Sequence, residues 1–268
     1  RNLFLTDLAE HIVSLGRGTR LQFLLEFIDE RADEFLAARS LYLERKLSGI
    51  IFLGSNLLGR EQELKRLDLP CVFATVDASG LNLNQVGSVS VDNYRAGWEA
   101  AEALYQLGHR RIAMLGYFGG EADATGRRLY GVRDCLLSHG LPFDEDLFVD
   151  CSFTLQRGWE AANELIDRRK PFSAVIAMSD TVAMGAMKAL HDRGIRVPED
   201  VSVVGFDGVE QGRFCTPSLA TMCQPAQEIA RITLELLGEM RAGKPGRHVL
   251  LSGLWQPGGS VRAIATET

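Results

Sequence analysis

The sequence predicts an α/β protein built from two doubly wound domains with parallel sheets. Its 268 residues suit two domains of about 130 residues each. Short runs of strand length recur along the chain and are apolar on both faces, as strands covered by helices on both sides are. These runs are 21–27, 50–53, 71–76, 112–115, 174–178 and 201–206.

Segments with helical spacing of apolar residues lie between these runs. They are 94–107, 129–138, 157–167, 181–192 and 227–240. Gly108, Gly140 and Gly194 each follow such a segment, where a left-handed residue ends a helix at low cost. Asp92 and Asp180 stand just before two of them, as N-cap or first-turn acids do. Because strands and helices alternate, the strands are expected to pair in parallel.

Composition excludes several classes of protein. No run approaches the ~18 apolar residues of a membrane span. With 29 basic and 35 acidic residues, the net charge of −6 makes this chain by itself a poor nucleic-acid binder. Its five cysteines are an odd number without a C-x-x-C pair, which favours reduced, mostly buried thiols over disulfides or a zinc site. The sequence begins at Arg1 rather than Met, which leaves open a preceding signal peptide or domain.

The candidate site follows from the sheet topology, because open α/β sheets bind ligands at the carboxyl ends of their strands. The residues at these positions are mostly polar: Ser55 and Asn56, Thr75 to Asp77, residues 119–128, Ser179 and Asp180, and Asp207 and Gly208. Phe153 and Gln224 stand in loops that could face the same cleft. Such a set suits a small polyhydroxylated or planar polar ligand.

Several of these residues have a second interpretation. Asp180 is a helix N-cap, a ligand contact, or both. Asp207 ends an apolar strand without a cationic neighbour in sequence, which favours ligand binding. Phe153 is either core or ligand contact. Arg127 and Arg128 begin a helix, where positive charge opposes the helix dipole, so one of them is expected to have an anionic or hydroxyl partner.

The sequence contains no convincing motif for catalysis, metal binding or nucleotide binding. Residues 238–244 (GEMRAGK) resemble a phosphate loop, but Pro245 replaces the hydroxyl residue and the segment ends a helix. There is no H-E-x-x-H, no G-x-S-x-G and no clustered His/Cys set. His109 follows Gly108, where fixing a tight turn is favoured over acting as a general base. We therefore expect no catalytic residue, no metal and no cofactor.

Five stretches together resemble the LacI/GalR-type bacterial transcription regulators. Residues 196–207 (RVPEDVSVVGFD) resemble the signature of that family. The other four agree in order and spacing: 91–93 with 107–113 (LGHRRIA), 126–131 (GRRLYG), 179–180 with 183–186 (AMGA), and 216–219 (TPSL) with 224–225. The resemblance runs from about residue 47 to residue 260.

The resemblance implies a type I periplasmic-binding-protein-like fold, with two domains joined by three crossovers and an effector cleft between them. It divides the chain into an amino-terminal subdomain of residues 1–90 and 225–247 and a carboxy-terminal subdomain of residues 91–224 and 248–268. A first strand is expected at residues 2–5. The resemblance also implies a cytoplasmic homodimer with a DNA-binding head that is absent from this chain.

The resemblance also implies roles for residues of the site. Arg128 would hold effector hydroxyls or a carboxylate, Asp207 would accept hydrogen bonds, and Phe153 would stack on the ligand. Gln224 would lie near the hinge and cleft. The remaining expected effector contacts are Ser179, Asp180, Thr75, Asp77 and Ser55. Ser179 replaces the usual Asn, and Thr75 stands where the family often has an Asp, for which Asp77 is a substitute.

The leading functional hypothesis is an effector-sensing and dimerisation domain that binds a small carbohydrate-like ligand and relays it to operator DNA through the missing head. A nucleobase is the second choice of effector. The alternative is a transport-type periplasmic sugar-binding protein, which five unpaired cysteines disfavour. A third hypothesis is an enzyme that uses Asp207 and His109. It is disfavoured because the sequence contains no catalytic motif.

Overall fold

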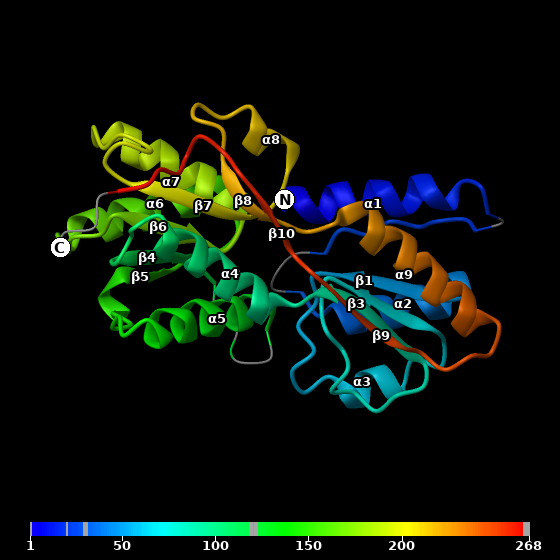
Figure 1. Cartoon of the computed structure of the whole chain (residues 1–268). Coiled ribbons are helices and arrows are strands. Elements are labelled where there is room, and N and C mark those ends of the chain that lie inside the picture. Colours follow the sequence, from blue (N-terminus) through cyan, green and yellow to red (C-terminus); the bar gives the residue numbers. More distant parts are fainter. Residues whose placement is uncertain (1, 20, 29–31, 118–119, 121–122, 265–268) are drawn as a thin grey trace. The chain divides into compact units, whose positions relative to one another are not determined.

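The chain folds into two compact units. The computed structural model describes residues 2–19, 21–28, 32–117, 120 and 123–264 (Figure 1). The larger unit comprises Arg1–Phe4, Asp92–Gln224 and Ser252–Thr268, and the smaller unit comprises Leu5–Val91 and Pro225–Leu251. The backbone passes from one unit to the other after Phe4, Val91, Gln224 and Leu251. The passage after Phe4 is additional to the three expected crossovers, because the first residues of the chain group with the larger unit.

The smaller unit contains a four-stranded parallel sheet in the order β1-β2-β3-β9. Its strands are β1 (Ile50–Leu53), β2 (Cys71–Ala74), β3 (Val86–Val91) and β9 (His248–Leu251). Its helices are α1 (Leu3–Gly16, whose first residues belong to the larger unit), α2 (Glu34–Arg45), α3 (Glu61–Lys65) and α9 (Ala226–Arg241).

The larger unit contains a six-stranded sheet in the order β10-β8-β7-β6-β4-β5, parallel except for β10. Its strands are β4 (Ile112–Gly116), β5 (Phe148–Asp150), β6 (Ala174–Ala177), β7 (Ser202–Asp207), β8 (Ala220–Cys223) and β10 (Leu254–Gln256). Its helices are α4 (Asn93–Gln106), α5 (Ala124–Ser138), the 3-10 helix η1 (Glu145–Leu147), α6 (Leu155–Asp167), α7 (Asp180–Asp192) and α8 (Glu210–Arg213). The predicted α/β class with parallel sheets is confirmed.

Alternation along the strands builds a separate core on each face of the larger sheet. In β4, Ala113 and Leu115 pack with α6 and α7, whereas Ile112 and Met114 pack with α4 and α5. Successive strand residues point to opposite faces, so a strand that is apolar at every position has both faces covered. The doubly apolar runs in the sequence reflect this arrangement.

Two glycines let α4 and α5 pack with their backbones in contact. A Cβ on Gly97 would lie 2.1 Å from the carbonyl oxygen of Arg128. A Cβ on Gly131 would lie 2.0 Å from the carbonyl oxygen of Tyr94. Neither position has room for a larger residue. This close approach places the first turns of α5 beside the start of α4.

Two expected strands are wrong. Residues 21–27 form no strand, and three of the apolar side chains in this run (Leu24, Leu25 and Phe27) are half exposed or more, so the run does not enter a sheet. Residues 2–5 lead into α1 instead, because Phe4, Leu8 and Ile12 recur every four residues and are buried along one helical face.

The helix boundaries largely follow the sequence signals. Asp92 caps α4 through a hydrogen bond from the backbone N–H of Arg95, as expected. Gly108, Gly140 and Gly194 all have positive φ after α4, α5 and α7. Of the two helix roles expected for Asp180, the first-turn acid is confirmed and the N-cap is wrong. Ser179 caps α7 by accepting from the N–H of Val182, and Asp180 is the first helical residue.

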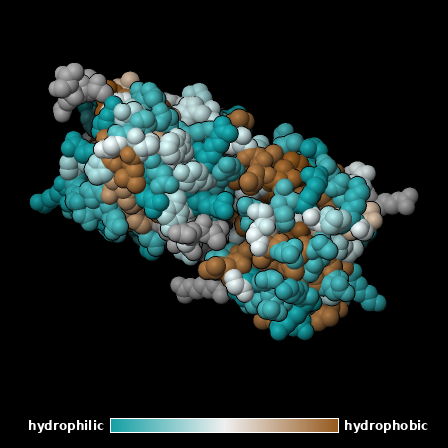
Figure 2. All heavy atoms as spheres, turned by 60° about the horizontal axis from the view of Figure 1, so that its bottom comes forward, coloured by the Kyte–Doolittle hydropathy of each residue, from teal (hydrophilic) through white to brown (hydrophobic). Residues whose placement is uncertain are grey.

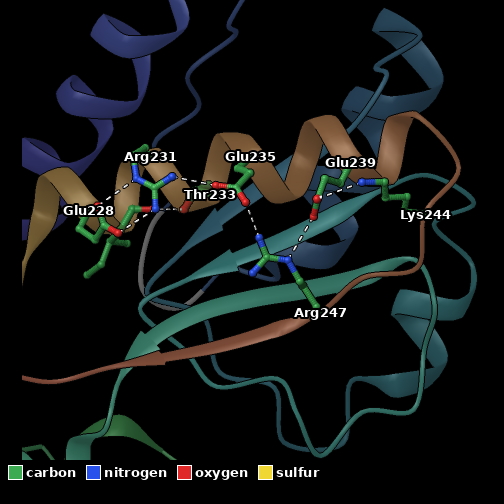
Figure 3. A network of polar contacts seen from close by, with 8 residues as sticks. Glu228, Arg231, Thr233, Glu235, Glu239, Lys244 and Arg247 are labelled. Atoms are coloured by element: carbon green, nitrogen blue, oxygen red, sulfur yellow. Dashed lines mark hydrogen bonds and ion pairs between the residues drawn. The ribbon is translucent and has the colours of Figure 1, made fainter.

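Charged residues on α9 form a continuous surface network with the segment that follows the helix (Figure 3). Arg231 bridges Glu228 and Glu235, and Arg247 bridges Glu235 and Glu239. Lys244 also pairs with Glu239, at 3.2 Å, so the lysine of the 238–244 motif is engaged in an ion pair after the end of a helix. Because these side chains are partly exposed, each pair contributes little stability.

The described surface mixes hydrophilic residues with exposed apolar ones, and Figure 2 shows apolar surface among the hydrophilic residues on one face. No helix in the described ranges is both long and apolar enough to cross a membrane.

Replacing Gly131 with Ala is expected to lower the free energy of unfolding by about 1–3 kcal/mol, because the new methyl group forces α4 and α5 apart. Gly238→Ala on α9 is the matched control, since no atom lies within 4 Å of its added Cβ. That control should be neutral or stabilising by up to about 1 kcal/mol. Urea unfolding measures both, and equal midpoints for Gly131→Ala and the unmodified chain would contradict the close packing.

Candidate functional site

Arg128 is the centre of a polar cluster at the carboxyl edge of the larger sheet. It lies in the second turn of α5 and is 5% exposed. Its Nε donates to Oδ1 of Asn93 at 2.8 Å, and its Nη1 donates to the carbonyl oxygen of Met178 at 2.7 Å. Its guanidinium also lies over the ring of Phe206, 4.5 Å from the ring centroid. The arginine is therefore held from three sides.

Asp207 supplies the opposite charge. It ends β7, and its Oδ1 lies 4.0 Å from Arg128 Nη1. The same oxygen accepts a hydrogen bond of 2.7 Å from Nε2 of Gln224. The backbone N–H of Gln224 also donates to the Asp207 carbonyl, at 3.0 Å. Arg128, Asp207 and Gln224 are thus brought together, and the anionic partner expected for an arginine at the start of this helix is Asp207.

Asp180 lies beneath this cluster as a fully buried support. One carboxylate oxygen accepts from the backbone N–H groups of Gly208 and Val209, at 2.7 and 2.8 Å. The other accepts from the Thr221 hydroxyl at 2.6 Å. These bonds tie the loop after β7 to the start of α7. Asp180 is 0% exposed, and its carboxylate accepts three hydrogen bonds. These bonds fix the conformation of the loop that follows Asp207.

Burial controls the charges of the site. It raises the pKa of both the Asp207 and Asp180 carboxyl groups, and repulsion from Asp207 adds to the rise for Asp180. Arg128 opposes the rise for Asp207. Burial likewise lowers the pKa of Arg128, against the attraction of Asp207. The charges of Arg128 and Asp207 are costly to bury, and each of the two stabilises the charged form of the other.

Arg128 keeps donor capacity beyond its described partners. Its Nη2 takes part in no hydrogen bond of the described residues, whereas the Asp207 carboxyl group also interacts with the backbone N–H of Asp180. Each of the two side chains keeps an exposed fraction of 6%. A charged donor and a charged acceptor are thus held 4.0 Å apart in side chains that are not fully buried.

Ser179 and Phe153 belong to the same sheet edge but have other contacts. Ser179 adjoins Met178, whose carbonyl binds Arg128, yet its own hydroxyl caps α7. Phe153 is partly buried against the core, and its ring meets that of Tyr117 edge to face with centroids 6.5 Å apart. An aromatic pair therefore follows strands β4 and β5.

Ser55, Thr75 and Asp77 lie in the smaller unit, at the carboxyl ends of β1 and β2. The Ser55 hydroxyl donates to Glu34 Oε2 at 2.8 Å, and Asp77 Oδ1 accepts from the N–H of Ser79. Thr75 has a φ of +83° and Asp207 a φ of +119°. Non-glycine residues in this region carry strain that is often found at functional sites.

The sequence does not predict two of the contacts of Arg128. Asn93 belongs to one of the family-like motifs and Phe206 to an apolar strand run, and neither pattern indicates a site residue. A signal for Asn93 existed, since it directly follows the Asp92 cap at the start of a helix. Its contact with Arg128, 35 residues later, depends on the packing of α4 against α5.

His109 occupies the turn between α4 and β4, as expected. Its Nδ1 lies 2.9 Å from Ser173 Oγ and its Nε2 lies 3.2 Å from the Arg262 carbonyl oxygen. The residue is 1% exposed, and burial lowers the pKa of its ring. Both ring nitrogens are engaged, which suits a histidine that fixes a turn.

Comparison with known proteins identifies the family. Residues 101–261 match the model of the periplasmic binding protein-like domain. The chain is 30% identical over 249 residues to the HTH-type transcriptional regulator DegA of Bacillus subtilis, covering 91% of this chain and 72% of the relative. The chain belongs to the LacI/GalR-type family of bacterial transcription regulators.

Two further transcription regulators are similar to the chain. The chain is 34% identical over 207 residues to the repressor CytR of Escherichia coli K12, covering 76% of this chain but 59% of CytR. A solved structure of the transcriptional regulator CelR in complex with cellobiose superposes with a TM-score of 0.85 at 29% identity, covering 96% of this chain and 79% of that one. The chain thus spans only part of these longer regulators.

Asp180→Ala is expected to lower the free energy of unfolding by about 2–4 kcal/mol, because two backbone N–H groups and one hydroxyl lose their buried acceptor. Glu160→Ala, whose partly exposed side chain pairs with Arg157, should stay within about 0.5 kcal/mol. Chemical unfolding of both variants makes the comparison. Equal losses would show that Asp180 does not hold the loop after β7.

Proposed function

We propose that this chain is the effector-sensing domain of a transcription regulator, and that a sugar or sugar derivative binds at the Arg128–Asp207–Gln224 cluster. The observation that carries the proposal is the pair of Arg128 and Asp207, whose nearest charged atoms are 4.0 Å apart and whose side chains each keep an exposed fraction of 6%. The site binds its ligand without chemical conversion, since family members are transcription regulators.

Neighbouring hydroxyl groups of a sugar match this pair. One hydroxyl oxygen accepts from Arg128 while the next hydroxyl donates to Asp207, and both hydrogen bonds are charge-assisted. The amide of Gln224 holds the acceptor in place from the other side. The aromatic pair of Phe153 and Tyr117 offers an apolar ring surface such as carbohydrate faces pack against.

The comparisons support this class of ligand over a nucleobase. The structure of CelR, 29% identical to this chain, was solved with cellobiose. We include Ser179 and Asp180 as positioning residues at the larger sheet, and Ser55, Thr75 and Asp77 as further effector contacts from the smaller unit. The three residues of the smaller unit stand at strand carboxyl ends, where α/β sheets present polar groups to ligands.

We propose that a separate part of the regulator binds the operator DNA. Matched relatives are HTH-type regulators of which the chain spans 59–72%, so we assign operator binding to a DNA-binding head elsewhere in the protein. Effector binding alters DNA binding only through different affinity for two conformations. A regulator of this kind works in the cytoplasm, which separates it from a periplasmic transport protein of the same fold.

A thermal-shift screen tests the site. Cellobiose, ribose and other sugars are added to the purified chain, together with nucleobases as a competing class. A ligand at about 100 times its dissociation constant adds about 2.7 kcal/mol of stability, which raises the melting temperature by several degrees. Arg128→Met and Asp207→Asn should remove most of that shift, because each loses one charge-assisted hydrogen bond worth about 1.5–3 kcal/mol.

The matched control is Arg196→Gln, since Arg196 makes a partly exposed ion pair with Asp200 just before β7, at the opposite end from Asp207. This variant should keep the full ligand-induced shift. Sugar binding that is unchanged in both Arg128→Met and Asp207→Asn would show that the sugar does not bind at this cluster. Stabilisation by nucleobases and by no sugar would overturn the ligand class.

We also propose that the chain forms a homodimer, supported by large apolar side chains left exposed on the larger unit. Phe214 is 79% exposed and Leu155 is 53% exposed. Phe214→Asp is expected to convert the dimer to monomer in analytical ultracentrifugation, because it would bury an unpaired charge in the interface. Leu58→Asp changes a 71% exposed apolar residue of the smaller unit, and comparing the two variants shows whether the dimer depends on Phe214 in particular. A monomeric unmodified chain would contradict the proposal.

A further inference from the structure

Three side chains with metal-ligand chemistry converge between α4 and α5, away from the Arg128 cluster. Glu102 comes from the last turns of α4, Cys135 from α5, and His139 from the C-cap of α5. Their potential ligand atoms all lie within 4.8 Å of one another. Cys135 and His139 are four residues apart, which places both on the same side of the end of α5.

The distances are close to those of a tetrahedral zinc site. Zinc lies at about 2.0–2.3 Å from its N, O and S ligands, so ligand atoms in a tetrahedron are roughly 3.3–3.6 Å apart. Cys135 Sγ lies 3.6 Å from Glu102 Oε2, already at that spacing. His139 Nε2 lies 2.6 Å from the same oxygen, within direct hydrogen-bond range. This pair has to open by under about 1 Å to admit a metal.

Neighbouring residues already orient two of the ligands. Gln106 Nε2 donates to the other Glu102 oxygen, Oε1, at 2.6 Å, so Oε2 stays directed at Cys135 and His139. The His139 ring stacks on Tyr105 with centroids 3.7 Å apart and planes at 12°. Supporting contacts of this kind fix ligand geometry in metal sites.

Access and burial also suit a metal ion. Cys135 is fully buried, whereas the Glu102 and His139 side chains are 32% and 25% exposed, so an ion can enter from the surface and meet the thiol at depth. A ligand set of one thiolate, one imidazole and one carboxylate favours zinc over the hard ions magnesium and calcium.

We propose that Glu102, Cys135 and His139 form a Zn²⁺ site that clamps α4 to α5, with water as the fourth ligand. On binding, the Cys135 thiol releases its proton to solvent and the thiolate coordinates the metal. The hydrogen bond between Glu102 and His139 is replaced by two bonds to zinc. Three protein ligands leave one position for exchangeable water.

Metal retention tests the site directly. The chain is stripped with a chelator, dialysed against Zn²⁺ and then against metal-free buffer, and its zinc is measured by elemental analysis. We expect one zinc per chain, and a zinc-dependent rise in melting temperature. Cys135→Ser and His139→Gln should each weaken binding by at least about tenfold and remove that rise.

Cys151→Ser is the matched control, because Cys151 is another buried free cysteine outside the cluster. It should bind zinc as the unmodified chain does. His139→Gln removes a partly exposed ion pair worth about 0–1 kcal/mol, so its melting temperature in chelator should fall by no more than a few degrees. A small change in chelator, together with loss of the zinc-dependent rise, separates loss of zinc from loss of fold.

Cobalt substitution identifies the ligands independently. Co²⁺ bound to the unmodified chain should show a thiolate-to-cobalt charge-transfer band, which Cys135→Ser abolishes. An unmodified chain that retains no zinc overturns the site. Zinc binding that persists unchanged in both Cys135→Ser and His139→Gln also overturns it.

Discussion

Burying the guanidinium of Arg128 is the constraint around which the larger unit is arranged. A cation that is 5% exposed must be compensated by charge and by hydrogen-bond acceptors. Asp207 supplies the charge, while Asn93 and the carbonyl of Met178 supply acceptors from the start of α4 and the end of β6. Three separate elements therefore have to arrive at one point. In the proposed function, a hydroxylated ligand completes the pairing of Arg128 with Asp207.

Packing away from the site makes this convergence possible. The helix α5 reaches Asn93 because Gly97 and Gly131 let two backbones touch. The loop after β7 holds its shape because Asp180 binds two of its N–H groups from below. In the proposed zinc site, the far ends of the same two helices are joined by a metal. If both proposals hold, the α4–α5 pair carries the effector cluster at one end and the zinc site at the other.

Much of this architecture could be predicted from patterns that local physics imposes. Runs that are apolar on both faces predicted β4, β6 and β7, and helical spacing of apolar residues predicted α4 and α7. Both patterns arise because neighbouring elements bury the apolar faces. The strand predicted at residues 21–27 is wrong, because apolar composition alone does not show whether a neighbouring strand is available for pairing. At the site, Arg128 and Asp207 were foreseeable from strand-end and helix-start positions. Asn93 was not foreseen, because its contact depends on tertiary packing.

The most direct test of the central claim follows the side chain of Arg128 itself. Its Nε–H is held by Asn93 and should give a protected arginine resonance in a ¹⁵N–¹H spectrum, assigned by its loss in Arg128→Lys. Titration with a stabilising sugar should shift this resonance and saturate with the same dissociation constant as the thermal stabilisation. A resonance that stays fixed while the sugar binds elsewhere would contradict the account.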